Sequence, residues 1–193
     1  MTDAAAAILT LPTATIVAGT PLPRIHREHR DAWHFSRSGS GRFDPVAASD
    51  PAIGACYLAD DALGAFVEVY RRMGAISEAD LATRRISTLS LSRDLVLVDL
   101  TDRAALLAGS DTSALSSSWD YREPQAFASA VADAGRDGVR YFARHDPAKR
   151  LCCNAILART DDQSLSRASS SEISEPLRRA AATAFGYKIL PVP

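Results

Sequence analysis

The sequence predicts a single α+β (mixed α/β) domain built on a mixed sheet, and three observations lead to this class. The 193 residues suit one domain that is large enough to bury a core. A hydrophobic fraction of 47% with 23% charged residues is typical of a soluble globular protein. Strand-like and helix-like segments are intermixed, and adjacent apolar runs at 86–91 and 95–100 argue against a regular βαβ alternation.

The chain begins with a segment that is rich in alanine and threonine. For residues 1–20 we expect a loose leader or a short early element, so the domain proper spans 21–193. A Pro-Leu-Pro sequence at 21–23 marks its entry. A first strand is expected at 24–27, and a loop rich in serine and glycine at 36–41.

The stretch 41–72 is the unit around which we expect the rest of the chain to be arranged. Residues 55–58 form an apolar run of strand length. The carboxylates of Asp60 and Asp61 are placed to cap the following helix, from about 61 to 72. The apolar face of this helix consists of residues at helical spacing: Leu63, Phe66, Val67 and Tyr70.

Two features of this stretch point beyond folding. Its opening turn, Gly-Arg-Phe-Asp-Pro at 41–45, joins the conformational freedom of Gly41 to a proline that fixes its own φ. Glu68 lies beside the apolar residues of the helix, and a carboxylate near a buried face needs a partner or a purpose.

Turn and capping signals delimit the remaining elements. Ser77 is expected to cap a helix to about residue 85, and the apolar runs at 86–91 and 95–100 form the best hairpin candidate. The other elements follow in order: a helix at 102–107, a polar loop at 110–118, a helix at 124–134 with Pro124 first, strands at 138–142 and 152–157, a serine-rich loop at 161–171, a helix at 175–184 and a strand at 187–192.

The composition excludes several classes of protein. A formal net charge of -1 gives no sequence-independent hold on nucleic acid or on an anionic membrane. No stretch approaches the roughly 20 apolar residues of a membrane span, and the N-terminus lacks the positive region of a signal peptide. The cysteines have neither disulfide nor metal spacing, so we expect reduced core thiols in a cytoplasmic protein: Cys56, Cys152 and Cys153.

The common catalytic motifs are absent: the sequence has no GxSxG, P-loop, GxGxxG or HExxH. Its four histidines have no ligand spacing, so no metal site is expected. What remains is Arg24, Arg42 and Glu68, at the edges of elements around one strand–helix unit. Guanidinium groups beside a flexible loop suit a diphosphate or carboxylate ligand. The plainer interpretation of Glu68 is a structural ion pair.

Four segments resemble the RES domain family, over about residues 20–160: PxRIHR, SGSGRFDP, CYLADDALGAFVE and DGVRYFARHDP. Members of this family are the toxin halves of bacterial toxin–antitoxin pairs and are named after Arg, Glu and Ser residues. The first arginine of the family matches Arg24, with Arg27 as a nearby rival. The GRF arginine matches Arg42, the strand tyrosine matches Tyr57, and the helix glutamate matches Glu68.

The resemblance implies a fold similar to that of ADP-ribosyltransferase toxins and the degradation of NAD. The bond between nicotinamide and ribose would break, with phosphate or water as acceptor and no separate cofactor. Glu68 would stabilise the oxocarbenium-like ribose, while Arg24 and Arg42 would hold the diphosphate or the attacking phosphate. Tyr57 would stack or hydrogen-bond near the nicotinamide. Further candidates for substrate binding are Arg27, Arg144 and His145.

Several alternatives remain open. Tyr57 suits a core position in its strand, and Arg42 suits a pair with Asp44 that fixes the turn. Ala143 stands where family members usually carry serine, and alanine donates no hydroxyl hydrogen bond. The chain is therefore an NAD-consuming enzyme, an ADP-ribosyltransferase acting on a macromolecule, or a non-catalytic member. The resemblance also implies a helix-turn-helix (Xre-like) antitoxin that inhibits the chain and makes any contact with DNA.

Overall fold

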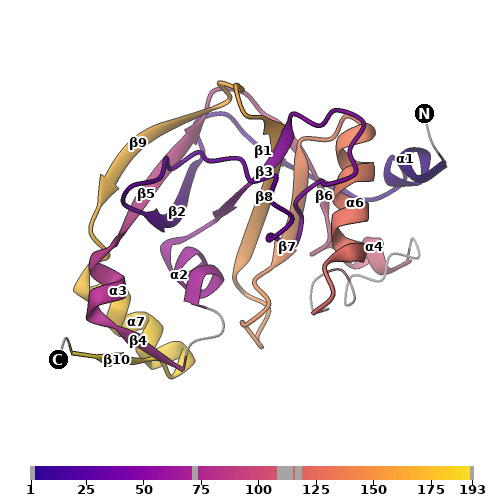
Figure 1. Cartoon of the computed structure of the whole chain (residues 1–193). Helices are drawn as coiled ribbons and strands as arrows, with labels where there is room; N and C mark the ends of the chain where they lie inside the picture. Colours follow the sequence, from indigo (N-terminus) through magenta and orange to yellow (C-terminus); the bar gives the residue numbers. More distant parts are fainter. Residues whose placement is uncertain (1–2, 71–73, 108–114, 116–118, 192–193) are drawn as a thin grey trace.

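The chain folds into intermixed helices and strands, and a computed structural model describes residues 3–70, 74–107, 115 and 119–191. In chain order the elements are α1 (Asp3–Ile8), β1 (Thr13–Ile16), β2 (Pro21–Arg27), β3 (Ile53–Ala59), α2 (Ala62–Tyr70), β4 (Ala75–Ser77), α3 (Glu78–Ala82), β5 (Arg84–Leu91), β6 (Leu95–Asp99), α4 (Arg103–Leu107), α6 (Arg122–Asp133), β7 (Gly138–Phe142), β8 (Cys152–Arg159), β9 (Leu165–Ser171), α7 (Glu175–Phe185) and β10 (Lys188–Leu190) (Figure 1).

Three sheets organise the strands. The largest has the order β1-β6-β7-β8-β3, in which β6 and β7 run parallel and the other neighbours antiparallel. The second is an antiparallel sheet of order β2-β5-β9, and the third pairs β4 with β10 in parallel. The largest sheet is therefore mixed, which confirms the predicted fold class.

The two faces of the five-stranded sheet contribute to two separate cores. On β3, Cys56 and Leu58 belong to the core shared with the three-stranded sheet, to which Leu89 of β5 also contributes. Ala55 and Ala59 belong to the opposite core, which includes α2 and α6. Figure 1 shows the three-stranded sheet on one side of the five-stranded sheet and α6 on the other.

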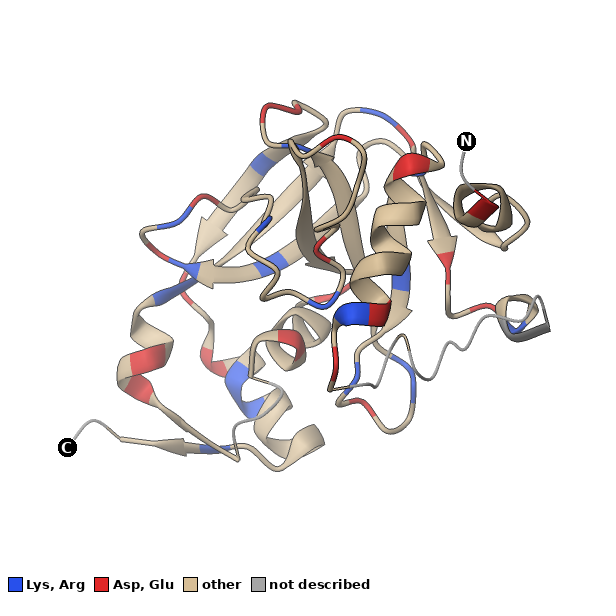
Figure 2. Ribbon diagram, turned by 45° about the vertical axis from the view of Figure 1, so that its right-hand side comes forward, with Lys and Arg blue, Asp and Glu red and all other residues tan. Residues whose placement is uncertain are grey.

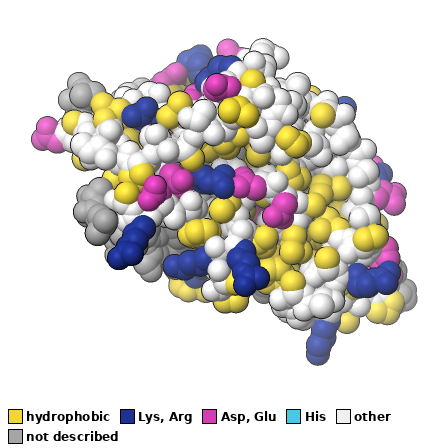
Figure 3. All heavy atoms as spheres, turned by 180° about the vertical axis from the view of Figure 1, so that it is seen from behind, with side chains coloured by type: hydrophobic (Ala, Val, Ile, Leu, Met, Phe, Trp, Pro, Cys, Tyr) yellow, Lys and Arg dark blue, Asp and Glu magenta, His cyan; other side chains and the backbone are white. Residues whose placement is uncertain are grey.

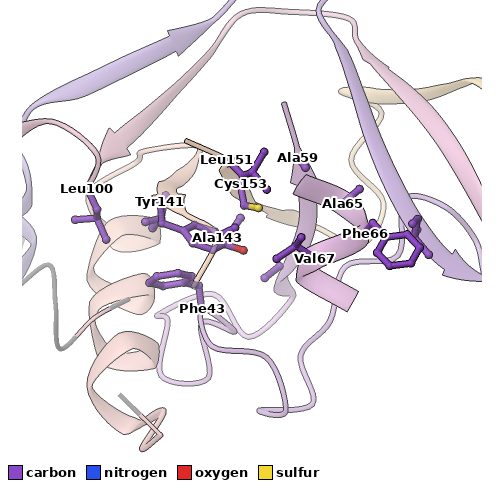
Figure 4. Close-up of a cluster of buried hydrophobic side chains, with 14 of the residues drawn as sticks. Phe43, Ala59, Ala65, Phe66, Val67, Leu100, Tyr141, Ala143, Leu151 and Cys153 are labelled. Carbon is purple, nitrogen blue, oxygen red and sulfur yellow. The ribbon is translucent and has the colours of Figure 1, made fainter. Parts of the chain in front are cut away.

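The core on the side of α2 and α6 holds most of the buried aromatic residues. Phe43 packs on Tyr141 of β7 with 4.9 Å between ring centroids, and Phe66 and Tyr70 of α2 are fully buried. This confirms the apolar face predicted for the helix. Ala143, only 1% exposed, belongs to the same core (Figure 4).

Most predicted elements are present with slightly shifted ends. Ser77 caps α3 as expected, because its Oγ accepts a hydrogen bond from the backbone N–H of Asp80 at 3.1 Å. Pro124 lies in the first turn of α6 but not at its first position, since the helix begins at Arg122. The predicted end of α2 and almost all of the polar loop at 110–118 lie outside the described residues.

The predicted hairpin of 86–91 and 95–100 is wrong. The two runs form β5 and β6, but β5 pairs with β2 and β9, whereas β6 pairs with β1 and β7. The linking residues are fixed by distant partners instead of a tight turn: Arg93 donates to Asp137 at 2.7 Å. The chain therefore crosses from one sheet to the other between the two strands.

Two further segments, 161–171 and 1–20, can be compared with what the sequence predicted for them. The loop predicted at 161–171 is wrong over its second part, because β9 pairs with β5 there. Only Leu165 of β9 is buried, so the strand has no alternating pattern in the sequence and owes its conformation to the ladder. Within residues 1–20, α1 and β1 form, and β1 is an edge strand of the five-stranded sheet.

Acidic and basic side chains are interspersed, in keeping with the formal net charge of -1. Figure 2 shows both signs along most of the ribbon, and Figure 3 shows them mixed with apolar side chains on the rear face. None of the helices among the described residues has the length and apolar character that crossing a bilayer would require.

His26 connects β2 to β5 and is buried. Its Nδ1 lies 2.9 Å from the carbonyl oxygen of Arg27, and its Nε2 lies 2.8 Å from Oγ of Ser87. In the neutral ring, Nδ1–H donates to the carbonyl and Nε2 accepts from the hydroxyl. Burial lowers the pKa of His26 below its usual 6.5, aided by the charge of Arg24 and opposed by the carbonyl bond.

We expect the stability of the fold to decrease as the pH falls below about 6.5, the usual pKa of histidine. The unfolded chain takes up a proton on His26 at a pH where the folded chain still resists it, so acid favours unfolding. Urea unfolding at about pH 7.5 and about pH 5.5 measures the effect. His26→Gln should reduce the difference, and His29→Gln, at an exposed position, should preserve it. Identical pH dependence in wild type and His26→Gln would contradict the assignment.

Candidate active site

A cavity of about 1180 Å³ lies beside β2, β3, α2 and the loop that precedes β3. Four of the site residues predicted from the sequence line this cavity: Arg24, Arg42, Tyr57 and Glu68. Among the described residues, the charged side chains that line it are four arginines and two carboxylates, namely Arg24, Arg30, Arg37, Arg42, Asp31 and Glu68. The excess of positive charge suits an anionic ligand.

Arg24 is fixed through one end of its guanidinium group. Its Nη1 lies 2.9 Å from the carbonyl oxygen of Ala32, 3.1 Å from that of His34 and 2.7 Å from Sγ of Cys56. Burial raises the pKa of the Cys56 thiol, so the sulfur accepts as a neutral group. No carboxylate in the described part of the chain forms an ion pair with Arg24, which leaves the rest of its fork to face the cavity.

The turn at 41–45 is built around the buried carboxylate of Asp44. This carboxylate accepts hydrogen bonds from the N–H of Gly41 at 3.1 Å, from Ser36 at 2.9 Å and from the hydroxyl of Tyr57 at 2.9 Å. The Tyr57 oxygen in turn accepts from the N–H of Phe43 at 2.9 Å. Burial and the charge of Asp44 raise the pKa of Tyr57 well above its usual value, so it remains a neutral donor.

Gly41 is required in this turn for space and not for the unusual dihedral angles that the sequence suggests. Its φ does not lie in the left-handed region. A Cβ atom there would lie 2.3 Å from Oδ1 of Asp44 and 2.4 Å from the Tyr57 hydroxyl, far inside van der Waals distance.

Arg42 is almost fully buried, with 5% of its surface exposed. Its guanidinium carbon lies 4.8 Å from the centroid of the Tyr121 ring, and its Nη1 donates to the carbonyl of Leu115 at 3.2 Å. Burial lowers the pKa of Arg42; the charge of Arg144 acts in the same direction and that of Glu68 opposes it. Asp44 uses its oxygens for other donors, so the alternative pairing of Arg42 with Asp44 is not what holds the turn.

Helix α6 fastens the loop that carries Arg42, a feature that sequence reasoning missed. The side-chain amide of Gln125 donates to the carbonyls of Gly39 at 2.8 Å and Gly41 at 3.0 Å. Gln125 is itself 8% exposed. Its contacts therefore place two partly buried hydrogen bonds directly before Arg42 in the chain.

Two further side chains of α6 continue this attachment. Oγ of Ser129 accepts from the N–H of Ala47 at 3.0 Å, and Oδ1 of Asp133 accepts from the N–H of Ser49 at 2.8 Å. Together with Gln125 they recur every fourth residue and so share one face of the helix. That polar spacing was the only signal in the sequence, and it does not say which segment the face meets.

Glu68 is half-buried on α2 and lines the cavity. Asp61 caps the helix as predicted, because its Oδ1 accepts from the N–H of Gly64 at 2.7 Å. Asp60 does not share this role: it forms an ion pair with Arg140 and accepts from Asn154 at 2.8 Å. The prediction that Asp60 also caps the helix is therefore wrong. Its carboxylate binds the guanidinium of Arg140 and the buried amide of Asn154 on neighbouring strands instead.

The other sequence candidates lie elsewhere. Arg27 is exposed, and its Nη2 lies 3.9 Å from Oδ1 of Asp80. The guanidinium carbon of Arg144 lies 4.0 Å from the centroid of the Trp119 ring. Among the described residues that line the cavity, neither arginine appears, nor does His145.

The fold and the cavity together define a single-domain protein of mixed sheet with a pocket that favours anions. The model of the RES domain family matches residues 21–179, and the chain belongs to this family. A chain in the crystal structure of the M. tuberculosis MbcT–MbcA toxin–antitoxin complex is similar, with a TM-score of 0.72 and 25% identity over 93% of this chain and 97% of that one. No curated protein sequence matches.

We expect Gly41→Ala to lower the free energy of unfolding by about 1–3 kcal/mol, because the new Cβ overlaps Asp44 and Tyr57. Gly74→Ala is the matched control, since a Cβ there meets nothing within 4 Å. Urea unfolding of both variants measures the difference. Equal stability of the two variants would show that the turn can open without cost and is not a fixed part of the site.

Proposed function

We propose that this chain is a toxin that degrades NAD by cleaving the bond between nicotinamide and ribose. The observation that carries the proposal is the convergence of Glu68, Arg24 and Arg42 on one cavity. Membership of the RES family supports the toxin class. The similar chain from the MbcT–MbcA toxin–antitoxin complex supports it further.

In the proposed reaction the bond between C1′ of the ribose and the nicotinamide nitrogen breaks. Its electron pair leaves with nicotinamide, and the ribose acquires oxocarbenium character. An oxygen of phosphate or of water then bonds to the same carbon, and the attacking group releases a proton to solvent. The product is ADP-ribose phosphorylated at this carbon, or ADP-ribose itself. The carboxylate of Glu68 stabilises the developing positive charge more than it stabilises bound NAD, which is what accelerates the step.

The arginines supply the anion site for the diphosphate or for the attacking phosphate. Arg24 offers the part of its fork that no described residue binds, because its contacts with the described residues all involve Nη1. Arg42 is a buried cation that also lines the cavity, so it can donate hydrogen bonds to an anion bound there. Tyr57 gives its hydroxyl hydrogen to Asp44, so we assign it to holding the turn and not to a hydrogen bond with nicotinamide.

The serine that Ala143 replaces is not needed in this proposal. Ala143 is buried in the core, and its side chain does not appear among the described residues that line the cavity. Three loop serines do line it: Ser36, Ser38 and Ser40. In this proposal their hydroxyl groups supply the hydroxyl donors and acceptors of the site.

Purified wild-type protein should consume NAD and release free nicotinamide, and Glu68→Gln should slow this at least about a hundredfold. Glu78→Gln, an exposed helix glutamate, is the matched control and should behave as wild type. Consumption that requires inorganic phosphate indicates phosphorolysis, and consumption without it indicates hydrolysis. Label from NAD appearing on a macromolecule would favour ADP-ribosyl transfer, and no NAD loss in wild type would overturn the proposal.

The same assay decides between the two arginines of β2. Arg24→Gln should raise the KM for NAD more than Arg27→Gln does, because Arg24 lines the cavity and Arg27 faces Asp80. A larger effect of Arg27→Gln would transfer the anion-binding role to that residue.

We also propose that a helix-turn-helix antitoxin inhibits the chain in the cytoplasm and that DNA contact is made only through this partner. Co-expression with the product of the adjacent gene should yield a complex that leaves NAD intact. Activity should return when the partner is removed. Full NAD consumption by the intact complex would contradict inhibition by that partner.

A further inference from the structure

We propose that Gln125 is a positioning residue that sets the affinity of the site for its anionic substrate by fixing the turn that carries Arg42. The inference rests on the proposed function and assigns a role to a helix, α6, that supplies none of the described residues lining the cavity.

The first argument is the place of the two hydrogen bonds. Gln125 donates to the carbonyls of Gly39 and Gly41, and the second of these belongs to the peptide unit that continues into Arg42. Gly39 has a φ of 71°, in the left-handed region. Two glycines make this the most permissive stretch of the loop, so its conformation depends on contacts from outside.

The second argument is that the same segment also holds the other end of Arg42. The ring of Tyr121 lies against the guanidinium, and the carbonyl of Tyr121 accepts the backbone N–H of Gln125 at 2.9 Å. The start of α6 therefore fixes both the backbone before Arg42 and its charged group. Arg24 and Glu68 lie on β2 and α2, whereas the side chain of Gln125 donates to Gly39 and Gly41 in the loop.

This division predicts which kinetic constant responds. Loss of the Gln125 contacts should displace Arg42, which binds the substrate, and leave Glu68, which acts on the reacting carbon, in place. The substrate affinity should therefore fall while the rate at saturation is retained. Substitutions of Ser129 and Asp133 should raise KM less than substitution of Gln125, because their contacts hold residues further from Arg42.

The test uses the full chain and three matched variants, Gln125→Leu, Ser129→Ala and Asp133→Ala. Two readouts are compared: the KM and kcat for NAD, and the hydrogen exchange of backbone amides in residues 36–50. Gln125→Leu should raise KM about tenfold with kcat within about twofold, the loss expected from two neutral hydrogen bonds. Smaller increases should follow in the order Ser129→Ala, then Asp133→Ala. Gln163→Leu, an exposed glutamine bonded to the carbonyl of Asp161, is the control.

A fourth variant separates positioning from general loosening. Gln125→Glu keeps the shape of the side chain but turns a carboxylate toward two carbonyl oxygens, which raises its pKa. Protonation restores one donor, so the KM of this variant should recover toward that of wild type as the pH falls. Protonation of the buried carboxyl group would also relieve a general destabilisation, so urea unfolding of Gln125→Glu is measured at the same pH values. A raised KM at a pH where the variant is fully folded indicates positioning, and a raised KM only where the variant unfolds indicates general loosening.

The outcomes divide cleanly. Faster exchange in residues 36–50 with raised KM in Gln125→Leu supports the inference. Unchanged KM, unchanged exchange, or a fall in kcat alone overturns it. A wild-type protein that does not consume NAD overturns the proposed function instead, and the exchange of the loop in Gln125→Leu then decides by itself whether Gln125 positions the turn.

Discussion

The buried carboxylate of Asp44 is the interaction on which the candidate site depends. A buried charge is tolerated only where donors surround it, and here the donors come from the loop serine, from the turn itself and from the strand tyrosine. These hydrogen bonds then restrict which residues can stand beside the carboxylate. The donor at residue 41 must be a glycine, because its neighbours leave no space for a side chain. Arg42 follows immediately and is placed by this cluster.

Successive side chains of strand β3 point to opposite faces, and they hold the two arginines of the site from these two sides. Cys56 points into the core beneath the three-stranded sheet, where its sulfur meets Arg24. Tyr57, the next residue, points to the other side and holds the turn before Arg42. The helix after the strand then brings Glu68 to the same cavity. One strand and one helix thus organise the site with few dedicated residues.

The sequence predicted the local parts of this arrangement because local physics determines them. Helical spacing identified the buried face of α2 from Phe66 and Tyr70, and a capping side chain identified the start of α3. Residue chemistry and the resemblance to the RES family together pointed to Arg24, Arg42 and Glu68, which line the cavity. The further candidates Arg27, Arg144 and His145 do not appear among the described lining residues. What failed was long-range pairing. The two apolar runs that form β5 and β6 are indistinguishable from a hairpin until the partner sheets are known, and β9 carries no alternating pattern. The role of Gln125 could not be predicted from the sequence, because its partners lie more than 80 residues away in the chain.

The two arginines belong to different layers of the molecule. Arg24 lies on the three-stranded sheet, and the loop of Arg42 is fastened to α6 on the far side of the five-stranded sheet. A diphosphate that engages both would act as a non-covalent cross-link between these layers, in addition to their apolar packing and the contact of Arg24 with Cys56. Side chains remote from the cavity set the distance between the layers. This distance would then determine the length of the anion that can bind both arginines. Substitutions deep in either core would be felt as changes in ligand selectivity.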